Sequence, residues 1–299
     1  MAKAQEVLGK MFKTFSSDFD DGRLDKFITD SERIMRRPAG LLLAQAGLDA
    51  STSEPFTLLD HACGTGPIAA HLQGSVDRRV LSGSKILCAD ISDNLVGTLK
   101  RRAEKHEWIN IETTVLDAQK SSLPDQSFSH VTLNFAMHVI PDPGAVLRDT
   151  MRVLKPGGTL AFTVWHKGNS GWVPDMKSSF ETLPFEAPMP DPFPMAPNGR
   201  AEFIDPDLIP EQLLGYGFED VEVRTAEHIM RVESASDYLG SFGMMKDWMM
   251  QAYWSEESKE KANSMLDDHM MRHLTEKHGG QGWDLKWTMV LVTCRKPSN

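Results

Sequence analysis

The sequence predicts an α/β fold in which strands and helices alternate to build a largely parallel sheet. Three observations predict it. Short apolar runs recur between residues 56 and 165, and several end in an acidic or amide side chain. Stretches of helical length separate these runs, and such alternation implies parallel strands joined by right-handed crossovers. A glycine turn at Gly64 and Gly66 follows the first run, near the sheet edge where such folds bind ligands.

Seven strands are expected, five in the alternating region and two near the end of the chain. Each is an apolar or β-branched run bounded by glycine, proline or polar residues. The expected strands occupy residues 56–59, 85–89, 111–116, 128–135, 159–165, 221–232 and 287–293.

The main expected helices cover residues 5–48, 93–107, 144–154 and 211–216. Gly22 and Pro38 are expected to interrupt the first, and Asp93 is a candidate N-cap of the second. Residues 155–158 (Lys-Pro-Gly-Gly) predict a helix stop and a turn. A helical insertion at about 235–278 separates the last two strands and is expected to form a cap.

Composition and charge narrow the classes of partner. The chain has 299 residues and a net charge of -10, which disfavours nucleic-acid and anionic membrane partners. The basic runs at 33–37 and 100–102 are expected to be solvated helix faces. No apolar run is long enough to cross a bilayer, and the N-terminus lacks a signal-peptide core. Cys63, Cys88 and Cys294 are scattered, which predicts no disulfide framework and a reducing, cytoplasmic location.

The glycine turn predicts a nucleotide-type cofactor site. Gly64 and Gly66 lack a Cβ, so the backbone can turn tightly and approach a ligand. Pro67 suits the first turn of a helix, whose free N–H groups favour a polar or anionic group. Gly64-x-Gly66-x-x-Ala69 also fits the dinucleotide fingerprint of a dehydrogenase. Against that alternative, Asp60 stands where a nicotinamide site usually has an apolar residue.

Four motifs in order resemble class I S-adenosylmethionine-dependent methyltransferases. They are Asp60-x-Ala62-x-Gly64-x-Gly66, Asp90 after the second strand, Asp117-Ala118 after the third, and Leu154-Lys155-Pro156-Gly157-Gly158 before the fifth. The resemblance implies a Rossmann-like, seven-stranded methyltransferase sheet with a helical N-terminal segment and an inserted helical cap. More narrowly, the chain resembles fungal small-molecule methyltransferases of the gliotoxin thiol-methylating type, at Lys100-Arg101-Arg102, Glu107-Trp108 and Trp165-His166 through Trp172.

The resemblance implies that S-adenosyl-L-methionine is the cofactor. Asp90 would accept both ribose hydroxyls, Ile91 would lie against the adenine, and Asp117 would accept from its exocyclic amine. The turn would approach the methionine moiety, and the end of the fourth strand would close the pocket near the sulfonium. The implied cofactor contacts are Asp60, Ala62, Gly64, Thr65, Gly66, Asp90, Ile91, Asp117, Ala118, Asn134 and Phe135.

Two histidines follow strands that lead to this pocket. His138 and His166 are candidate catalytic bases, since histidine titrates near neutrality; each could instead satisfy loop backbone groups. His269 and His273 have metal-ligand spacing on a helix, but no third ligand converges in sequence. We therefore expect no metal site.

Aromatic and methionine side chains of the cap are candidates for the substrate pocket, with ordinary core packing as the alternative. The candidates are Phe15, Trp165, Trp172, Met245, Trp248 and Met249. The chain is expected to divide into a helical lid segment (1–50), a cofactor-binding core (51–166) and a completion of the sheet (167–299). Cap insertions are expected at about 167–210 and 235–278.

The expected function is methylation of a small, largely apolar metabolite at sulfur, nitrogen or oxygen, in secondary metabolism. No nucleic-acid or membrane partner is expected, and the sequence does not indicate an oligomeric state. Two alternatives bind the same cofactor without transferring its methyl group. One is a regulator of other proteins, and the other is an enzyme that catalyses a rearrangement beside the fixed positive charge of the sulfonium.

Overall fold

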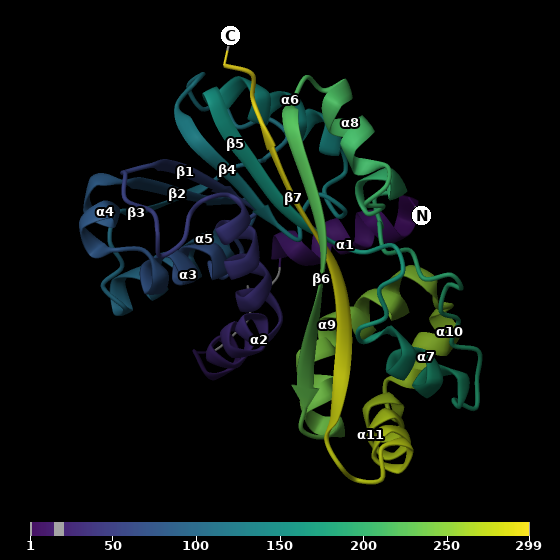
Figure 1. The fold of residues 1–299 in the computed structure, drawn as a ribbon. Coiled ribbons are helices and arrows are strands. Elements are labelled where there is room, and N and C mark those ends of the chain that lie inside the picture. Colours follow the sequence, from purple (N-terminus) through teal and green to yellow (C-terminus); the bar gives the residue numbers. More distant parts are fainter. Residues whose placement is uncertain (1, 15–20, 299) are drawn as a thin grey trace.

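The computed structural model describes residues 2–14 and 21–298, and it contains one seven-stranded sheet (Figure 1). The spatial order is β3-β2-β1-β4-β5-β7-β6, in which β7 is antiparallel to both of its neighbours and all other pairs are parallel. The strands are β1 (Thr57–His61), β2 (Lys85–Asp90), β3 (Ile111–Val115), β4 (Phe128–Asn134), β5 (Leu154–Trp165), β6 (Glu219–Val232) and β7 (Trp283–Arg295). The expected α/β class and the seven strands are confirmed.

Helices cover both faces of the parallel part of the sheet. One hydrophobic cluster joins one face to α2 (Asp21–Gln45), α3 (Pro67–Ser75) and α4 (Arg78–Gly83). A second cluster joins the other face to α6 (Pro143–Val153), η1 (Ala201–Phe203) and α8 (Ile209–Gly215). Helix α5 (Asp93–Lys105) lies beside β2 and β3 at the sheet edge.

The last two strands extend well beyond the parallel strands and carry a helical cap (Figure 1). A third hydrophobic cluster packs the cap against this ribbon and includes residues of the N-terminal helix. The helices of the cap are α7 (Val173–Glu181), α9 (Ala235–Tyr253), α10 (Glu256–Ala262) and α11 (Leu266–Lys277). Helix α1 (Ala2–Thr14) packs against them, mainly against α9. The expected helical insertion at 235–278 consists of three helices, α9, α10 and α11.

The structure corrects two local predictions about helices. Pro38 does not interrupt its helix, because α2 runs through it and buries Pro38, Ala39, Leu42 and Leu43. Packing of this face offsets the backbone hydrogen bond that a proline removes. Ser92, and not Asp93, caps α5: its hydroxyl accepts from the Leu95 N–H at 3.4 Å.

The segment 155–158 is part of β5 and not only a turn. Leu154 pairs with Phe128 of β4. The Gly157 N–H donates to the Lys296 carbonyl at 3.0 Å, and the Lys296 N–H donates to the Gly158 carbonyl at 2.9 Å. Gly157 adopts a φ of 73°, which a glycine tolerates. Partners distant in sequence therefore extend the strand, which local propensity does not indicate.

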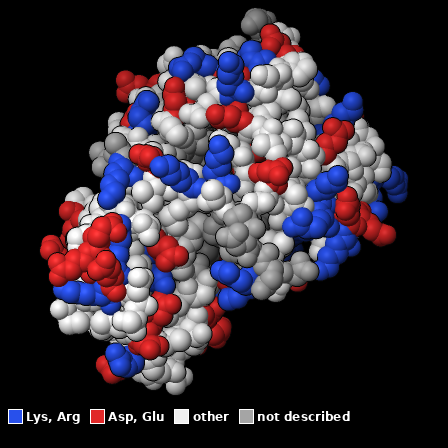
Figure 2. All heavy atoms as spheres, turned by 180° about the vertical axis from the view of Figure 1, so that it is seen from behind, with Lys and Arg blue, Asp and Glu red and all other residues white. Residues whose placement is uncertain are grey.

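The basic runs are not simply solvated faces. Arg33 pairs with Asp237 at 2.8 Å, and Arg102 pairs with Glu32 at 2.6 Å. Both ion pairs join α2 to another element. Elsewhere acidic and basic side chains are interspersed over the face seen in Figure 2. Among the described residues, no helix is both long and apolar enough to span a membrane.

Candidate functional site

The glycine turn connects β1 to α3 at the carboxyl end of the parallel strands. Ala62, Gly64 and Gly66 all adopt positive φ, at 51°, 55° and 85°. A Cβ on Gly66 would lie 2.7 Å from Leu99 Cδ1, whereas a Cβ on Gly64 would meet no atom within 4 Å. Gly66 is therefore needed for close packing against α5, and Gly64 leaves open space on its exposed side. Open space beside bare backbone suits the approach of a cofactor.

Asp90 at the end of β2 is tied to the turn. Its Oδ2 accepts from the Gly64 N–H at 2.9 Å, and its Oδ1 accepts from the Ser92 N–H at 2.9 Å. Burial raises the pKa of Asp90, and the backbone hydrogen bonds from Ser92 and Gly64 oppose that rise. Each carboxylate oxygen can accept a further bond. Ile91 is 46% exposed beside it and offers an apolar surface of the kind that a nucleobase covers.

Asp117 follows β3 at the same edge of the sheet, since the Leu116 N–H donates to the Asp90 carbonyl at 2.9 Å. Asp117 is exposed, and its Oδ1 accepts from the backbone N–H of Gln119 at 2.9 Å. Ala118 is buried. The Asp117 carboxylate is thus oriented by its own loop and accessible to a ligand.

Asp60 lies beneath the turn and is fully buried. Its Oδ1 accepts from the Thr132 hydroxyl at 2.8 Å, and its Oδ2 has no partner among the described residues. Burial raises the pKa of Asp60 to about 7. An unpartnered buried carboxylate oxygen fits a ligand that brings an N–H donor or a positive charge. His61, next in the chain, is also buried, and burial lowers its pKa to about 4.

The end of β4 forms the neighbouring wall of the site. Phe135 adopts a φ of 57°, and its N–H donates to Thr163 Oγ1 at 2.9 Å. The same hydroxyl donates to Asn134 Oδ1 at 2.7 Å, while Asn134 Nδ2 has no partner among the described residues. Thr163 therefore holds both residues, a role for which the sequence carries no local signal.

The two candidate bases differ in their surroundings. His138 is buried, its Nδ1 has no partner among the described residues, and burial lowers its pKa to about 3. His166 Nδ1 accepts from the Gly168 N–H at 3.0 Å. That contact places the proton of the neutral His166 ring on Nε2, which is then a donor and not an acceptor. Neither arrangement favours strong general-base catalysis.

Aromatic rings connect this wall to the cap. Phe135 stacks on Trp165 at 3.9 Å between ring centroids, and Trp165 contacts Trp287 at 4.7 Å. Trp165 packs against all three hydrophobic clusters, so it lies where the parallel part of the sheet meets the cap. Trp287 is buried, and its indole N–H has no partner among the described residues. Sequence reasoning missed Trp287, although it lies in an expected strand.

The other substrate candidates are distributed differently. Trp172 is buried and meets Phe193 edge-on at 5.2 Å. Trp248 donates its indole N–H to the Ala4 carbonyl at 2.9 Å, and Met249 is fully buried; both belong to the core between α1 and α9. Met245 is half-buried against that core. Phe15 lies outside the described residues.

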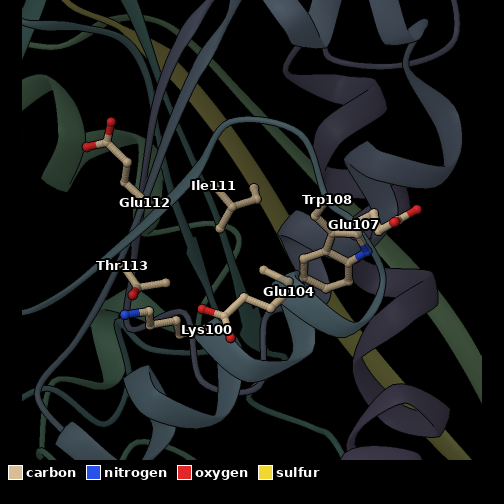
Figure 3. A pocket seen from close by; sticks show the side chains of 8 residues that line it. Lys100, Glu104, Glu107, Trp108, Ile111, Glu112 and Thr113 are labelled. Carbon is tan, nitrogen blue, oxygen red and sulfur yellow. The ribbon is translucent and has the colours of Figure 1, made fainter.

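A separate hollow of about 480 Å³ lies between α5 and β3 (Figure 3). Its walls include Lys100, Glu104 and Trp108 from α5 and the loop after it, and Ile111 at the start of β3. These residues are at the amino end of β3, whereas the glycine turn and Asp90 are at the carboxyl edge. The hollow is therefore not the cofactor site.

Comparison with known proteins agrees with this geometry. The model of the ubiE/COQ5 methyltransferase family matches residues 44–186. Over 90% of this chain and 95% of the relative, the chain is 29% identical to methyltransferase tpcH of Aspergillus fumigatus. It is 27% identical to the acetylaranotin bis-thiomethyltransferase of Aspergillus terreus, over 87% of this chain and 89% of that one. The chain is an S-adenosylmethionine-dependent methyltransferase. Its sheet has the class I methyltransferase fold.

Solved structures share the fold of this methyltransferase. Phosphoethanolamine N-methyltransferase 2 of Haemonchus contortus, in complex with S-adenosyl-L-methionine, has a TM-score of 0.57 at 16% identity. That comparison covers 96% of this chain and 59% of the other. The YcgJ protein of Bacillus subtilis has a TM-score of 0.50 at 13% identity, over 88% of this chain and 99% of that one. The cofactor of the methyltransferase is S-adenosylmethionine, and the open side of Gly64 and the unpartnered oxygen of Asp60 fit it.

Proposed function

We propose that the methyltransferase acts on a small, largely apolar metabolite of secondary metabolism. The observation that carries this proposal is the stack of Phe135, Trp165 and Trp287, which leads from the end of β4 into the cap. Aromatic surface beside the cofactor turn suits a flat, apolar acceptor. The names of two relatives, a methyltransferase of Aspergillus fumigatus and a bis-thiomethyltransferase of Aspergillus terreus, support the same class.

In this proposal the residues of the carboxyl edge hold the cofactor. Asp90 would accept the ribose hydroxyls, Ile91 would lie against the adenine, and Asp117 would accept from its amine. The turn at Gly64 and the buried Asp60 would hold the methionine moiety. S-adenosylmethionine supplies an electrophilic methyl group bound to a sulfonium. The remaining implied contacts are Ala62, Thr65, Gly66, Ala118, Asn134 and Phe135.

The chain then contributes alignment and exclusion of water. Helix α1 covers the segment after β4, where Gln5 Nε2 donates to the Val139 carbonyl at 2.5 Å. We propose residues 1–50 as a lid, 51–166 as the cofactor core, and 167–299 as the segment that completes the sheet and carries the cap. A lid and cap that enclose the acceptor bring its nucleophile into line and remove competing water.

The acceptor is proposed to need little help in losing a proton. The pKa of His138 is lowered by burial, and His166 presents a donor at Nε2. Thiols and amines attack without a strong base, whereas an alcohol needs one. We therefore propose that His138 and His166 orient the acceptor by hydrogen bonding, and that a thiol or amine is favoured over an alcohol. The buried free cysteines support a reducing, cytoplasmic location.

Matched aryl acceptors test this function. The purified protein is incubated with S-adenosylmethionine that carries a deuterated methyl group and with 2-naphthalenethiol, 2-naphthylamine or 2-naphthalenemethanol. The masses of the products report transfer, and an extract of fungal metabolites is tested in parallel. We expect one labelled methyl group on a small molecule, with the thiol ahead of the alcohol. Label found only in a macromolecular fraction, or on no small molecule, would contradict the proposal.

A further inference from the structure

We infer that Arg102 is a positioning residue that holds the glycine turn in its cofactor-binding shape. The inference rests on the proposed placement of the cofactor at this turn. Arg102 lies on α5, outside the motifs that carry the cofactor contacts. Its side chain is 13% exposed, although Lys100 and Arg101 beside it are exposed.

Three contacts fix the Arg102 guanidinium. Its Nη1 donates to the Thr65 carbonyl at 2.8 Å, and its Nη2 donates to Glu32 Oε1 at 2.6 Å. Its Cζ lies over the Trp108 ring, 5.1 Å from the ring centroid. A planar guanidinium can make two directed bonds while stacked on an indole, which a lysine ammonium cannot reproduce. The side chain is therefore built into one orientation that points at the turn.

The hydrogen bond to the Thr65 carbonyl helps to fix the backbone conformation of the turn. It belongs to the peptide between Thr65 and Gly66, whose N–H donates to the Cys63 carbonyl at 2.9 Å. Because the two ends of a planar peptide move together, Arg102 and Cys63 jointly fix its orientation. Gly64 is held separately through Asp90. Without these anchors, two glycines at positive φ would sample many other conformations.

Helix α2 supplies the second hydrogen-bond partner of the Arg102 guanidinium, and we call the pair of Arg102 and Glu32 the clamp. Glu32 holds the guanidinium from the far side, and Ser31 Oγ lies 3.0 Å from Thr65 Oγ1. One residue further on, Arg33 pairs with Asp237 at the start of α9. A single turn of α2 thus contacts both the cofactor turn and the cap. Arg102 and Glu32 therefore connect α2 to the backbone of the turn.

Calorimetric titration with S-adenosylhomocysteine tests the clamp without any acceptor substrate. We expect Arg102→Lys to weaken binding about tenfold or more, because a charge-assisted bond to the turn is lost or misdirected. Glu32→Gln, which keeps the shape of the side chain, should weaken it to a smaller extent. Arg101→Ala on the same helix is the matched control and should bind as the wild type does.

Hydrogen exchange distinguishes positioning from general destabilisation. In Arg102→Lys and Glu32→Gln, amides of residues 62–66 should exchange faster than in the wild type while the thermal midpoint stays unchanged. Affinity and exchange at wild-type values in both variants would overturn the inference, as would a loss of affinity no greater than that of Arg101→Ala. If Arg102→Lys does not fold, affinity and hydrogen exchange of Glu32→Gln test the inference instead. A wild type that binds S-adenosylhomocysteine but methylates no metabolite would refute the proposed function and leave the clamp standing.

Discussion

At the scale of single residues, the site depends on buried polar groups that the fold does not fully satisfy. Asp60 is held by Thr132 through one oxygen, and the other has no partner among the described residues. Its pKa is raised to about 7 because burial penalises the charged form. An Asp in the unfolded chain titrates near 4. The folded state therefore binds the Asp60 proton more tightly than the unfolded state.

This difference predicts a pH dependence of stability. The contribution of Asp60 is fully present below about pH 4 and is lost as the pH rises through about 7. Asp60→Asn removes that loss. The free energy of unfolding of the variant minus that of the wild type should therefore rise by about 2 kcal/mol from pH 5 to pH 8. Urea unfolding of both proteins at the two pH values measures it. If this difference between variant and wild type is the same at both pH values, the pKa of Asp60 is not raised.

The two glycines of the turn should respond differently to the same substitution. A Cβ on Gly66 would lie 2.7 Å from Leu99 at a φ of 85°, so Gly66→Ala should cost about 1–3 kcal/mol of stability. On Gly64 a Cβ meets open space. Gly64→Ala should cost less stability but strongly weaken binding of S-adenosylhomocysteine. Thermal unfolding and calorimetry of the two variants check this, and equal effects in both assays would contradict it.

At the scale of elements, the sequence indicated the parallel strands and their order along the chain well, because each is a compact apolar run between turn residues. The sequence did not indicate local structure that depends on contacts between residues far apart in the chain. Pro38 is accommodated because α2 buries it, and β5 begins at Leu154 because β4 supplies a partner. Arg102 was grouped with its exposed neighbours, since its contacts to Thr65 and Glu32 arise only in the folded chain.

Within the cap, the Asp175 carboxylate of α7 accepts hydrogen bonds from other elements. Asp175 is buried and accepts from Lys277 Nζ at 2.8 Å, His278 Nε2 at 3.0 Å and Trp283 Nε1 at 2.8 Å. Burial raises the pKa of Asp175, but the bonds from Lys277 and His278 outweigh it and lower the pKa below its ordinary value. One carboxylate thus connects α7 to the end of α11 and the start of β7.

Removal of this carboxylate should loosen the cap. Asp175→Ala leaves the Trp283 N–H and two basic groups without their partner, and we expect a loss of about 3 kcal/mol. Asp191→Ala, which breaks an exposed pair with Lys177, is the control and should change stability by less than about 1 kcal/mol. Chemical unfolding gives the free energies, and limited proteolysis should cut the cap faster only in Asp175→Ala. Equal stability of the two variants would contradict this role.

At the scale of the whole molecule, β6 and β7 join two halves, the parallel part of the sheet and the cap, in one continuous ribbon (Figure 1). The three hydrophobic clusters meet at Trp165, close to the end of β4. The sequence predicted a cap between the last two strands, but not the contact of α2 with both halves. That contact depends on Arg33 and Asp237, which are far apart in the chain.

Because both halves contact α2, cofactor binding should stabilise the chain as a unit. S-adenosylhomocysteine at one hundred times its dissociation constant should raise the free energy of unfolding by about 2.7 kcal/mol. The thermal midpoint should rise in a single transition. Two separate transitions, of which only one responds to the ligand, would show that the halves unfold independently.

We propose that the carboxyl ends of β1, β2 and β3 and the glycine turn together hold the cofactor. Calorimetric titration of the wild type and of Asp90→Ala with S-adenosylhomocysteine tests this placement. We predict saturable, one-to-one binding by the wild type and a large loss of affinity in the variant, with the fold retained by circular dichroism. Absence of binding by the wild type, or equal binding by both proteins, would contradict the claim.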